Sequence, residues 1–551
     1  MPSRLALARR RLATARRPRV VVGDHPTMTI EWDVPVEVRD GTVLRVNVFR
    51  PTGDAAVPAL LSAHPYGKDA IPARSRTGRR LNAQFRLFPQ PETIHLSDLT
   101  SWEAPDPAFW VAHGYAVVNA DLRGAGTSDG VGTLFSAQEA DDHHDLVEWV
   151  GTRPWCTGKV GLDGVSYLAI SQYRVAATRP PHLAAMCPWE GFSDLYRDFA
   201  RPGGVREDGF SIIWSAATRR AARVRGNLRR EVVRRPERDD WYVERTPDLE
   251  RIEVPMLVCA SFSDHSLHTR GSFEAFRRSG SSARWLTTHR GGKWSRYYSA
   301  EASEERLRFF DHVLKGADNG WDRRPPVRIR VHERGDRPVD VVDADAWPPR
   351  DLDVTTLHLD AATGGIDEGP PRAAAAPLRL PQGRRRFRWS IPRDLDVVGP
   401  MALTLSIVAE DATDANLFVA VRKLHHGREV HFEGSYGFAG DVVTRGWQRL
   451  AHRALDEELS TPLQPVHRHD RVEPLPPGEV VPVHVALLPH ATRFRAGDEL
   501  VVELRGRWLF PRNPLFGQFP AGYRRSPPAR VTVHTGGATA STLRLGVRTI
   551  G

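Results

Sequence analysis

A strand-to-helix turn is encoded in Val160-Gly161-Leu162-Asp163-Gly164-Val165-Ser166-Tyr167-Leu168. Its apolar start is typical of a short buried strand, and residues 167–178 have the pattern of a helix. Ser166 therefore lies at a sharp bend two residues after a glycine, where its hydroxyl is lifted clear of the backbone. The amides that begin the helix would face any negative charge formed there. The bend predicts a nucleophilic serine, but a serine in a purely structural turn has the same short pattern, and Leu168 stands where such bends usually carry glycine.

The chain around this turn alternates between strand-like and helix-like segments. A hairpin about Asp40-Gly41 is expected first, from residues 34–38 and 43–49. Further strands are expected over residues 59–63, 115–120, 160–162, 256–260 and 284–288, and helices behind the Ser136/Glu139 capping box, over 167–178, over 269–278 and up to Gly316. Strands that alternate with helices predict the α/β class, with a mostly parallel sheet covered on both faces.

Two further regions have a different character. Residues 195–250 are charged and lack strand-like runs, which predicts a helical insertion that caps the core. From residue 325 onward, β-like runs are separated by Pro, Gly and Asp, which predicts an all-β sandwich or jelly roll. The expected organisation is a basic, flexible tail, a core in two parts, the cap and the β domain, over residues 1–27, 28–194 with 251–324, 195–250 and 325–551 respectively.

Composition excludes several classes of protein. The 551 residues are 40% hydrophobic and include 15 Trp and 21 Phe, which argues against wholesale disorder. No run approaches about 18 uncharged apolar residues, so no membrane span is expected. The net charge of +10 arises from 77 Lys and Arg against 67 Asp and Glu that are interspersed, without a recognised nucleic-acid module, so no nucleic-acid partner is expected. Three cysteines and the lack of a secretory signal pattern predict a cytoplasmic protein without a disulfide framework.

A serine hydroxyl is a weak nucleophile unless a histidine takes its proton and a carboxylate orients that histidine. In α/β hydrolases the acid and then the histidine follow the serine, on loops at the carboxyl ends of later strands. Asp264 follows the strand-like residues 256–260, and His289 ends the next predicted strand. We therefore predict a catalytic triad of Ser166, Asp264 and His289. His265 and His268 are rivals, but beside the acid at the start of a helix their default interpretation is that of solvated loop residues.

Two further clusters of polar residues could suggest a metal. They are Asp141-Asp142-His143-His144-Asp145 and the pair His467 and His469. Adjacent residues on a helix point in different directions, and acidic residues suit the start of a helix without any ion. The two histidines belong to a Pro-rich polar loop. No metal and no organic cofactor is therefore predicted.

The chain from about Met28 to its end resembles the X-Pro dipeptidyl-peptidase/cocaine esterase (CocE/NonD) family of α/β-hydrolase serine hydrolases. The resemblance rests on blocks in the same order, namely Pro65-Tyr66-Gly67-Lys68, Asp121-Leu122-Arg123-Gly124, residues 161–171, Asp264, Thr288-His289-Arg290-Gly291-Gly292-Lys293-Trp294, Ala346-Trp347-Pro348 and Phe494-Arg495-Ala496-Gly497. It implies an α/β-hydrolase core with an inserted helical cap and a C-terminal jelly roll. It also implies Ser166 as nucleophile, Asp264 as acid, His289 as base, and an oxyanion hole made by the Tyr66 hydroxyl and the Tyr167 amide.

Three functions remain open at this point. The first is hydrolysis of an ester or amide of a small molecule through an acyl-enzyme. The second is removal of X-Pro dipeptides from free peptide N-termini, which needs a carboxylate for the α-ammonium group; Glu190, Asp194 and Asp198 are the candidates. The third is a non-catalytic binding protein on a hydrolase scaffold. The sequence identifies neither the acyl group nor the leaving group, and it leaves a homo-oligomer open.

Overall fold

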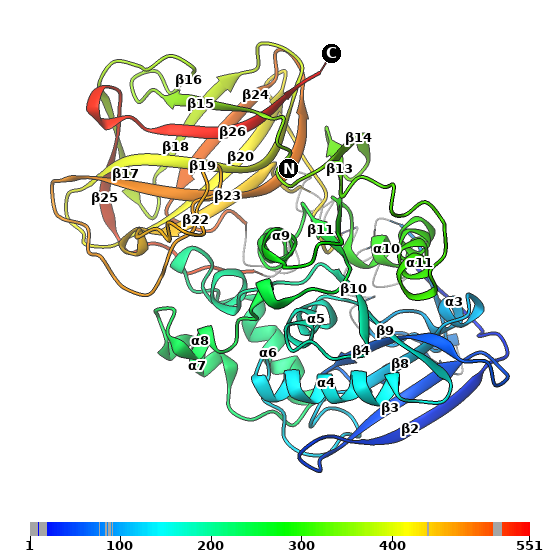
Figure 1. The fold of residues 1–551 in the computed structure, drawn as a ribbon. Coiled ribbons are helices and arrows are strands. Elements are labelled where there is room, and N and C mark those ends of the chain that lie inside the picture. Colours follow the sequence, from blue (N-terminus) through cyan, green and yellow to red (C-terminus); the bar gives the residue numbers. More distant parts are fainter. Residues whose placement is uncertain are drawn as a thin grey trace.

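The structure is a computed structural model of the chain (Figure 1). It describes Arg9 and residues 19–75, 78–82, 85, 90, 92–437, 440–510 and 521–550. Most of the predicted N-terminal tail therefore lies outside the described residues. The last part of that tail contains strand β1 (Val20–Gly23), which pairs in parallel with β7 (Ile94–Ser97), so regular structure begins before the predicted Met28.

A mixed sheet forms the centre of the core, in the order β2-β3-β8-β4-β9-β10-β11-β12-β13-β14. The strands are parallel from β8 to β13, and β2, β3 and β14 run antiparallel to their neighbours. Their bounds are β2 (Thr29–Glu37), β3 (Val43–Arg50), β4 (Val57–His64), β8 (Ala116–Asp121), β9 (Cys156–Val165), β10 (Leu183–Trp189), β11 (Met256–Ser261), β12 (Arg284–His289), β13 (Val327–His332) and β14 (Pro338–Ala344). This arrangement confirms the predicted α/β class.

The predicted boundary at residue 325 precedes a strand that pairs with both the core and the β domain. The strand at residues 327–331 was expected to open the β domain, but β13 pairs in parallel with β12 and extends the core sheet. Strand β14 then adds an antiparallel edge to it. The sequence does not distinguish the two pairings, since a strand that follows the last helix of the core has the same apolar pattern whichever sheet it joins.

Helices cover both faces of the core sheet, and the alternation of side chains along β8 shows the two faces. Val118 belongs to one buried cluster and Val117 to another, as expected for neighbouring residues of a strand. On the first face lie α4 (Ala137–Gly151), α5 (Tyr167–Ala177) and α9 (Thr269–Arg278). On the second face lie α3 (Pro107–Ala112) and α11 (Ala300–Lys315). Helix α5 therefore starts directly behind β9 and places Ser166 at the carboxyl end of the parallel strands.

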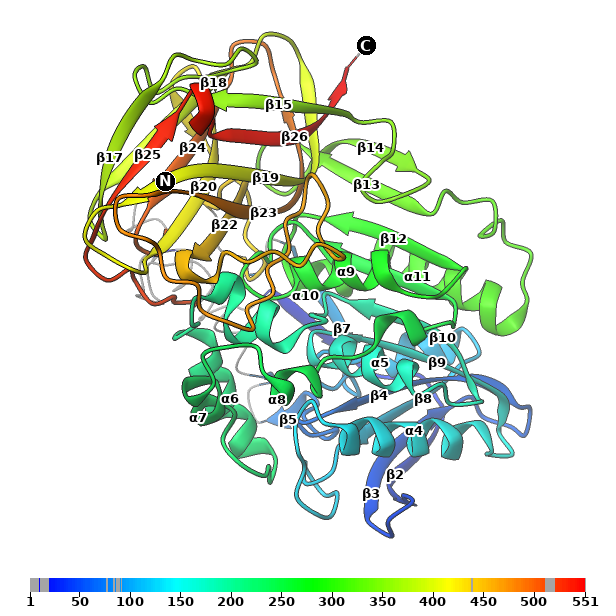
Figure 2. The same cartoon turned by 60° about the vertical axis from the view of Figure 1, so that its left-hand side comes forward.

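The insertion between β10 and β11 consists of short helices, as predicted for the cap. They are a π-helix (Leu195–Ala200), a 3-10 turn (Pro202–Gly204), α6 (Phe210–Ala221), α7 (Leu228–Arg234), α8 (Asp240–Val243) and a second 3-10 turn (Leu249–Arg251). Figure 2 shows α6, α7 and α8 together at one side of the core. Backbone pairing of Ala222 with Ala125, and of Val224 with Gly132, joins the end of α6 to the loop after β8.

The C-terminal region is an all-β domain of two sheets, which confirms the predicted jelly roll. In the first sheet, the long strand β19 pairs with β23 on one edge and with β25 and β26 on the other, and β15, β16 and β17 complete it. The second sheet contains β18, β24, β20, β21 and β22. The bounds are β15 (Asp353–Leu359), β16 (Ile366–Asp367), β17 (Ala374–Leu380), β18 (Arg384–Ser390), β19 (Leu395–Ala409), β20 (Asn416–His425), β21 (Arg428–Val430), β22 (Thr444–Arg449), β23 (Val480–Phe494), β24 (Glu499–Arg505), β25 (Ala529–Thr535) and β26 (Thr542–Thr549).

The three cysteines, Cys156, Cys187 and Cys259, are buried and unpaired. Within the described ranges, every helix is too short or too polar to cross a membrane.

Candidate active site

The backbone at Ser166 has a strained conformation. Ser166 has φ 62° and ψ −114°, a region that residues with a side chain rarely adopt. The backbone on either side is fixed, because the Ser166 amide donates to the Trp189 carbonyl at 3.0 Å and the Val165 amide donates to the Glu103 carbonyl at 3.1 Å. The predicted strand-to-helix bend is thereby confirmed.

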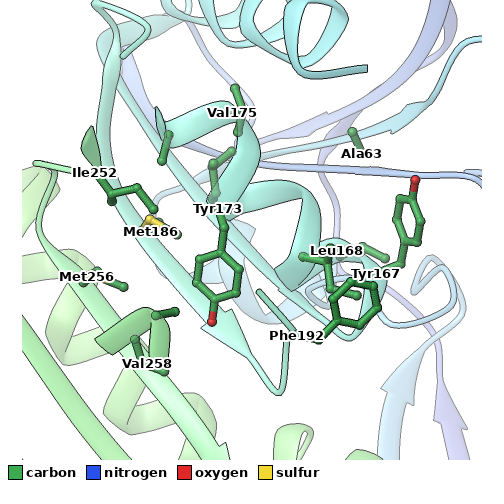
Figure 3. Packing of buried hydrophobic residues seen from close by; sticks show 14 of the residues in the cluster. Ala63, Tyr167, Leu168, Tyr173, Val175, Met186, Phe192, Ile252, Met256 and Val258 are labelled. Carbon is green, nitrogen blue, oxygen red and sulfur yellow. The ribbon is translucent and has the colours of Figure 1, made fainter. Parts of the chain in front are cut away.

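Two close contacts explain how helix α5 accepts Leu168 at a position that usually carries glycine. A Cβ atom on Gly164, which has φ 150°, would lie 2.5 Å from the Leu168 Cβ, so the glycine before the serine makes room for that leucine. The small residue of this helix start is Ala169, one position later. It packs closely on Gly191, where an added Cβ would lie 2.9 Å from the Ala169 Cβ. Figure 3 shows Leu168 buried at the start of α5 near Phe192. The close packing at the strand-to-helix bend is therefore kept, with Gly164 against Leu168 and Gly191 against Ala169.

The histidine that meets the serine is His268. Its Nε2 lies 3.3 Å from the Ser166 Oγ, and its Nδ1 lies 2.5 Å from the Asp264 Oδ2. The turn after β11 creates this arrangement, because the amides of Leu267, His268 and Thr269 all donate to the Asp264 carbonyl and bring residue 268 back over residue 264. His268 and Asp264 are both almost fully buried. The default interpretation of His268 as a solvated loop residue is therefore wrong.

His289 occupies a different place from the one predicted. It ends β12 as expected, but its Nε2 lies 3.1 Å from Glu190 Oε1 and its Nδ1 accepts from the Gly291 amide at 3.2 Å. Burial, together with the positive charge of nearby Arg296, lowers the pKa of His289 well below its ordinary value, so the imidazole is neutral. Strand order places both histidines at the same end of the sheet, but the imidazole that contacts the Ser166 hydroxyl is that of His268. The other rival, His265, is also buried and faces the Pro489 carbonyl.

The acid of the site is held in its ionised form. Burial alone would raise the pKa of Asp264, but the ammonium group of Lys293 and the neighbouring His268 hold that pKa well below its usual range. Lys293 Nζ lies 2.7 Å from the same Asp264 oxygen. Burial lowers the pKa of His268, and the positive charge of Lys293 lowers it further. At neutral pH the site therefore contains a carboxylate and an uncharged imidazole, which is the state that a general base needs.

Tyr66 and Tyr167, the predicted oxyanion hole, both border the same cavity as Ser166. The Tyr66 hydroxyl accepts a hydrogen bond from the Trp214 indole of the cap at 3.0 Å, which leaves its own proton for another partner. Burial raises the pKa of Tyr66 well above its ordinary value, so this proton is retained. Tyr167 is the first residue of α5, and its side chain turns away to donate to Glu139 at 2.6 Å. The part of Tyr167 next to Ser166 is its backbone amide, at the N-terminus of α5.

The cavity next to Ser166 has a volume of about 180 Å³ and is mainly aromatic. Its walls come from the core, the cap and the β domain, and include Tyr66, Trp102, Phe135, Tyr167, Phe192, Phe199, Phe210, Trp214, Trp294 and Tyr436. Glu103 contributes a carboxyl group to this lining. Burial raises the pKa of Glu103 to about 8, and its Oε1 accepts from the Trp294 indole at 3.0 Å. The cavity suits an apolar acyl group of modest size.

The carboxylates predicted to bind an α-ammonium group have other roles. Asp194 caps the π-helix of the cap and pairs with Arg197 at 2.9 Å. Asp198 pairs with Arg270 at 2.7 Å. Glu190 is fully buried beside His289, and burial raises its pKa to about 7. None of the three is among the described residues that line the cavity, whereas Glu103, which the sequence did not point to, is one of them.

Glu190, Asp264 and His268 approach one another closely enough to resemble a metal site. Their ligand atoms all lie within 4.8 Å of one another. The positive charge that this cluster would seek in a metal is already supplied by Lys293, whose Nζ lies 2.7 Å from Asp264 and 3.9 Å from Glu190. The residues therefore fit an ammonium ion of the chain itself better than a bound cation.

Comparisons with known proteins show which proteins this chain is similar to. The profile of the X-Pro dipeptidyl-peptidase (S15 family) matches residues 40–292, and that of the X-Pro dipeptidyl-peptidase C-terminal non-catalytic domain matches residues 319–544. A cocaine esterase from Rhodococcus is 34% identical over 189 residues, which is 34% of this chain and 28% of that protein. The aligned part thus spans little more than a quarter of this curated relative.

Solved structures extend the likeness over the whole chain. A CocE/NonD family hydrolase from Staphylococcus aureus is 34% identical, with a TM-score of 0.89, and the match covers 95% of this chain and 94% of that one. An aminopeptidase from a marine sediment archaeon, Thaumarchaeota archaeon, has a TM-score of 0.71 at 15% identity, covering 95% of this chain and 96% of that chain. The second likeness shows a shared fold alone.

Proposed function

Because the chain belongs to the CocE/NonD family of hydrolases, we propose that it is a serine hydrolase that cleaves an ester or amide bond of a small substrate through an acyl-enzyme. The observation that carries the proposal is the contact of the Ser166 Oγ with the His268 Nε2 at 3.3 Å, with Asp264 on the other nitrogen of the same ring. In this assignment His268, rather than the predicted His289, is the general base. A cytoplasmic location stays a prediction.

Acylation begins when the Ser166 hydroxyl attacks the substrate carbonyl carbon and His268 Nε2 accepts the hydroxyl proton. Asp264 keeps the other ring proton on Nδ1, so that Nε2 presents its lone pair to the serine. The carbonyl oxygen becomes an oxyanion, and the Tyr66 hydroxyl and the Tyr167 amide donate to it. His268 then returns its proton to the leaving alcohol or amine. Water repeats these steps on the acyl-enzyme and releases the acid, with His268 again as the base.

Labelling with a fluorophosphonate probe tests the proposal directly. The probe phosphonylates a serine activated by a base, with loss of fluoride, so a stoichiometric mass increase that maps to the peptide containing Ser166 is expected. A folded protein that fails to react would favour the third function, a binding protein on a hydrolase scaffold.

A panel of aryl esters and anilides then measures which acyl groups the aromatic cavity accepts.

Tyr66→Phe removes the proposed oxyanion donor and should lower kcat by about 10²–10³-fold with little change in KM, since the hydroxyl acts mainly on the charge of the transition state. Tyr167→Phe is the matched comparison. It removes a hydroxyl from the same region but keeps the amide, and it leaves buried Glu139 without the donor it has at 2.6 Å. We therefore expect the second variant to lose stability rather than turnover. Equal losses of kcat in both variants would contradict the assignment of Tyr66.

The second candidate function is an X-Pro dipeptidyl-peptidase, and the profile match over residues 40–292 together with Glu103 favours it. A substrate ammonium group in the cavity would lower the pKa of Glu103, so that Glu103 would release its proton to solution and pair with the ammonium as a carboxylate. If this is the function, a glycyl-prolyl anilide should be cleaved far faster than its N-acetylated form, and Glu103→Gln should remove the difference. Ready cleavage of aryl esters together with equal rates for the two anilides would favour the esterase.

A further inference from the structure

Lys293 is the first residue of the short helix α10 (Lys293–Tyr297) and is completely buried at the base of the candidate site. Its Nζ lies 2.7 Å from the Asp264 Oδ2, 2.9 Å from the His268 Nδ1 and 3.9 Å from Glu190 Oε2. The ammonium also donates to the Tyr436 hydroxyl of the β domain at 3.2 Å. A buried cation thus touches both the acid and the base that the reaction uses.

A lysine, and not an arginine, occupies this place. Only five of the 77 Lys and Arg side chains of the chain are lysines. A compact ammonium can approach one carboxylate oxygen and one ring nitrogen together, whereas a planar guanidinium needs more room. The backbone also holds Lys293 in place, because its amide donates to the Ser435 carbonyl at 2.7 Å. The side chain is therefore fixed from two domains.

Charged groups from several elements of the fold surround His268. Asp264 and Glu190 are the acidic groups at the ends of β11 and β10, Lys293 is the cation from α10, and Glu103 lies across the cavity. Asp264 favours the protonated imidazole, while Lys293 opposes it at a distance of 2.9 Å. The ammonium at the same time fixes the Asp264 oxygen to which the Nδ1 proton must point.

Building on the proposed function, we propose that Lys293 is a positioning residue of this hydrolase, whose ammonium group anchors the Asp264 carboxylate and keeps His268 uncharged between turnovers. The reaction requires a neutral imidazole as the base. A fixed cation beside Nδ1 makes protonation of the free enzyme harder, so the base stays available in more acidic solution. The pKa of His268 is indeed lowered, first by burial and then by Lys293.

The test is the pH dependence of fluorophosphonate labelling in Lys293→Met and Lys293→Gln. Removing the cation raises the pKa of His268, because the neighbouring carboxylates then act unopposed. Activity needs the neutral base, so labelling is lost on the acidic side of the pH profile as His268 takes up a proton. This acid limb of the profile should move to higher pH, by about one unit or more. Lys293→Gln keeps a hydrogen-bond donor but no charge, and should show the same displacement even if Lys293→Met folds poorly. A milder variant, Tyr436→Phe, should displace the limb in the same direction by less.

Lys423→Met is the matched control. Lys423 is also buried and pairs with Asp498 at 3.0 Å, but on β20 of the jelly roll. It should lose stability without moving the acid limb. An unchanged limb in folded Lys293→Gln, or an equal displacement in Lys423→Met, would overturn the role of Lys293. Failure of the wild-type protein to label at any pH would instead overturn the proposed function, so the two failures are distinguishable.

Discussion

His268→Ala is expected to lower kcat by about 10⁶-fold, the size of effect seen when a serine hydrolase loses its general base. The variant keeps the Ser166 hydroxyl but loses His268, the base that contacts this hydroxyl among the residues that the structure describes. The fold should survive, because Asp264 retains Lys293 as a partner at 2.7 Å and is not left as an isolated buried charge. The measurement is single-turnover hydrolysis of an activated aryl ester, with circular dichroism as a check of folding.

His289→Ala is the control for that experiment, since His289 also lies at the carboxyl end of the parallel strands and is also buried. Its Nε2 contacts Glu190 and its ring lies 5.6 Å from that of Trp189, so the expected cost is a packing defect rather than the loss of the base. The variant should still be labelled by a fluorophosphonate. An inactive His289→Ala beside an active His268→Ala would restore the triad first predicted from the sequence.

The sequence carried enough information for the fold and for two members of the site. Gly164 and Ser166 mark the bend through a local pattern, and Asp264 is placed by the order of strands. The histidine could not be chosen in this way, because His268 follows β11 and His289 ends the adjacent parallel strand β12, where it pairs with Ser261. What decides between them is the turn at residues 264–268, which carries the His268 ring back onto Asp264. The spacing of an acid and a histidine four residues apart, just before a helix, was the signal that could have found it.

Other members of the site leave no such signal. Lys293 touches Asp264 only because a loop of the β domain, which includes Ser435 and Tyr436, closes over α10. Glu103 reaches the cavity because its backbone adopts φ 64° in the loop before α3. Both arrangements depend on contacts between segments far apart in the chain. Local propensity and spacing contain no information about such contacts, whereas the strand and helix periods do determine the sheet.

Ser166→Ala and Ser166→Gly should each lower kcat by about 10⁶-fold, since either change removes the nucleophile. Their stabilities should differ. The backbone at residue 166, with φ 62° and ψ −114°, lies in the mirror image of the β region, which costs a residue with a Cβ atom about 1–3 kcal/mol and suits glycine. A glycine at this position also makes the unfolded chain more flexible, which offsets about 0.4–1 kcal/mol of the stability gained by relieving the strain.

The glycine variant should therefore be more stable than the alanine variant by about 1 kcal/mol, and more stable than the wild-type protein. Urea unfolding followed by tryptophan fluorescence would measure the difference, with both variants compared under the same conditions. The comparison with alanine matters because both variants lack the contact of Ser166 with His268, so only the backbone effect remains. If the alanine variant proved as stable as the glycine variant, the bend would not be strained, and its unusual backbone angles would no longer support a catalytic serine. A more stable glycine variant would mean that the fold gives up stability to hold one hydroxyl beside an imidazole, as a nucleophile requires and a structural turn does not.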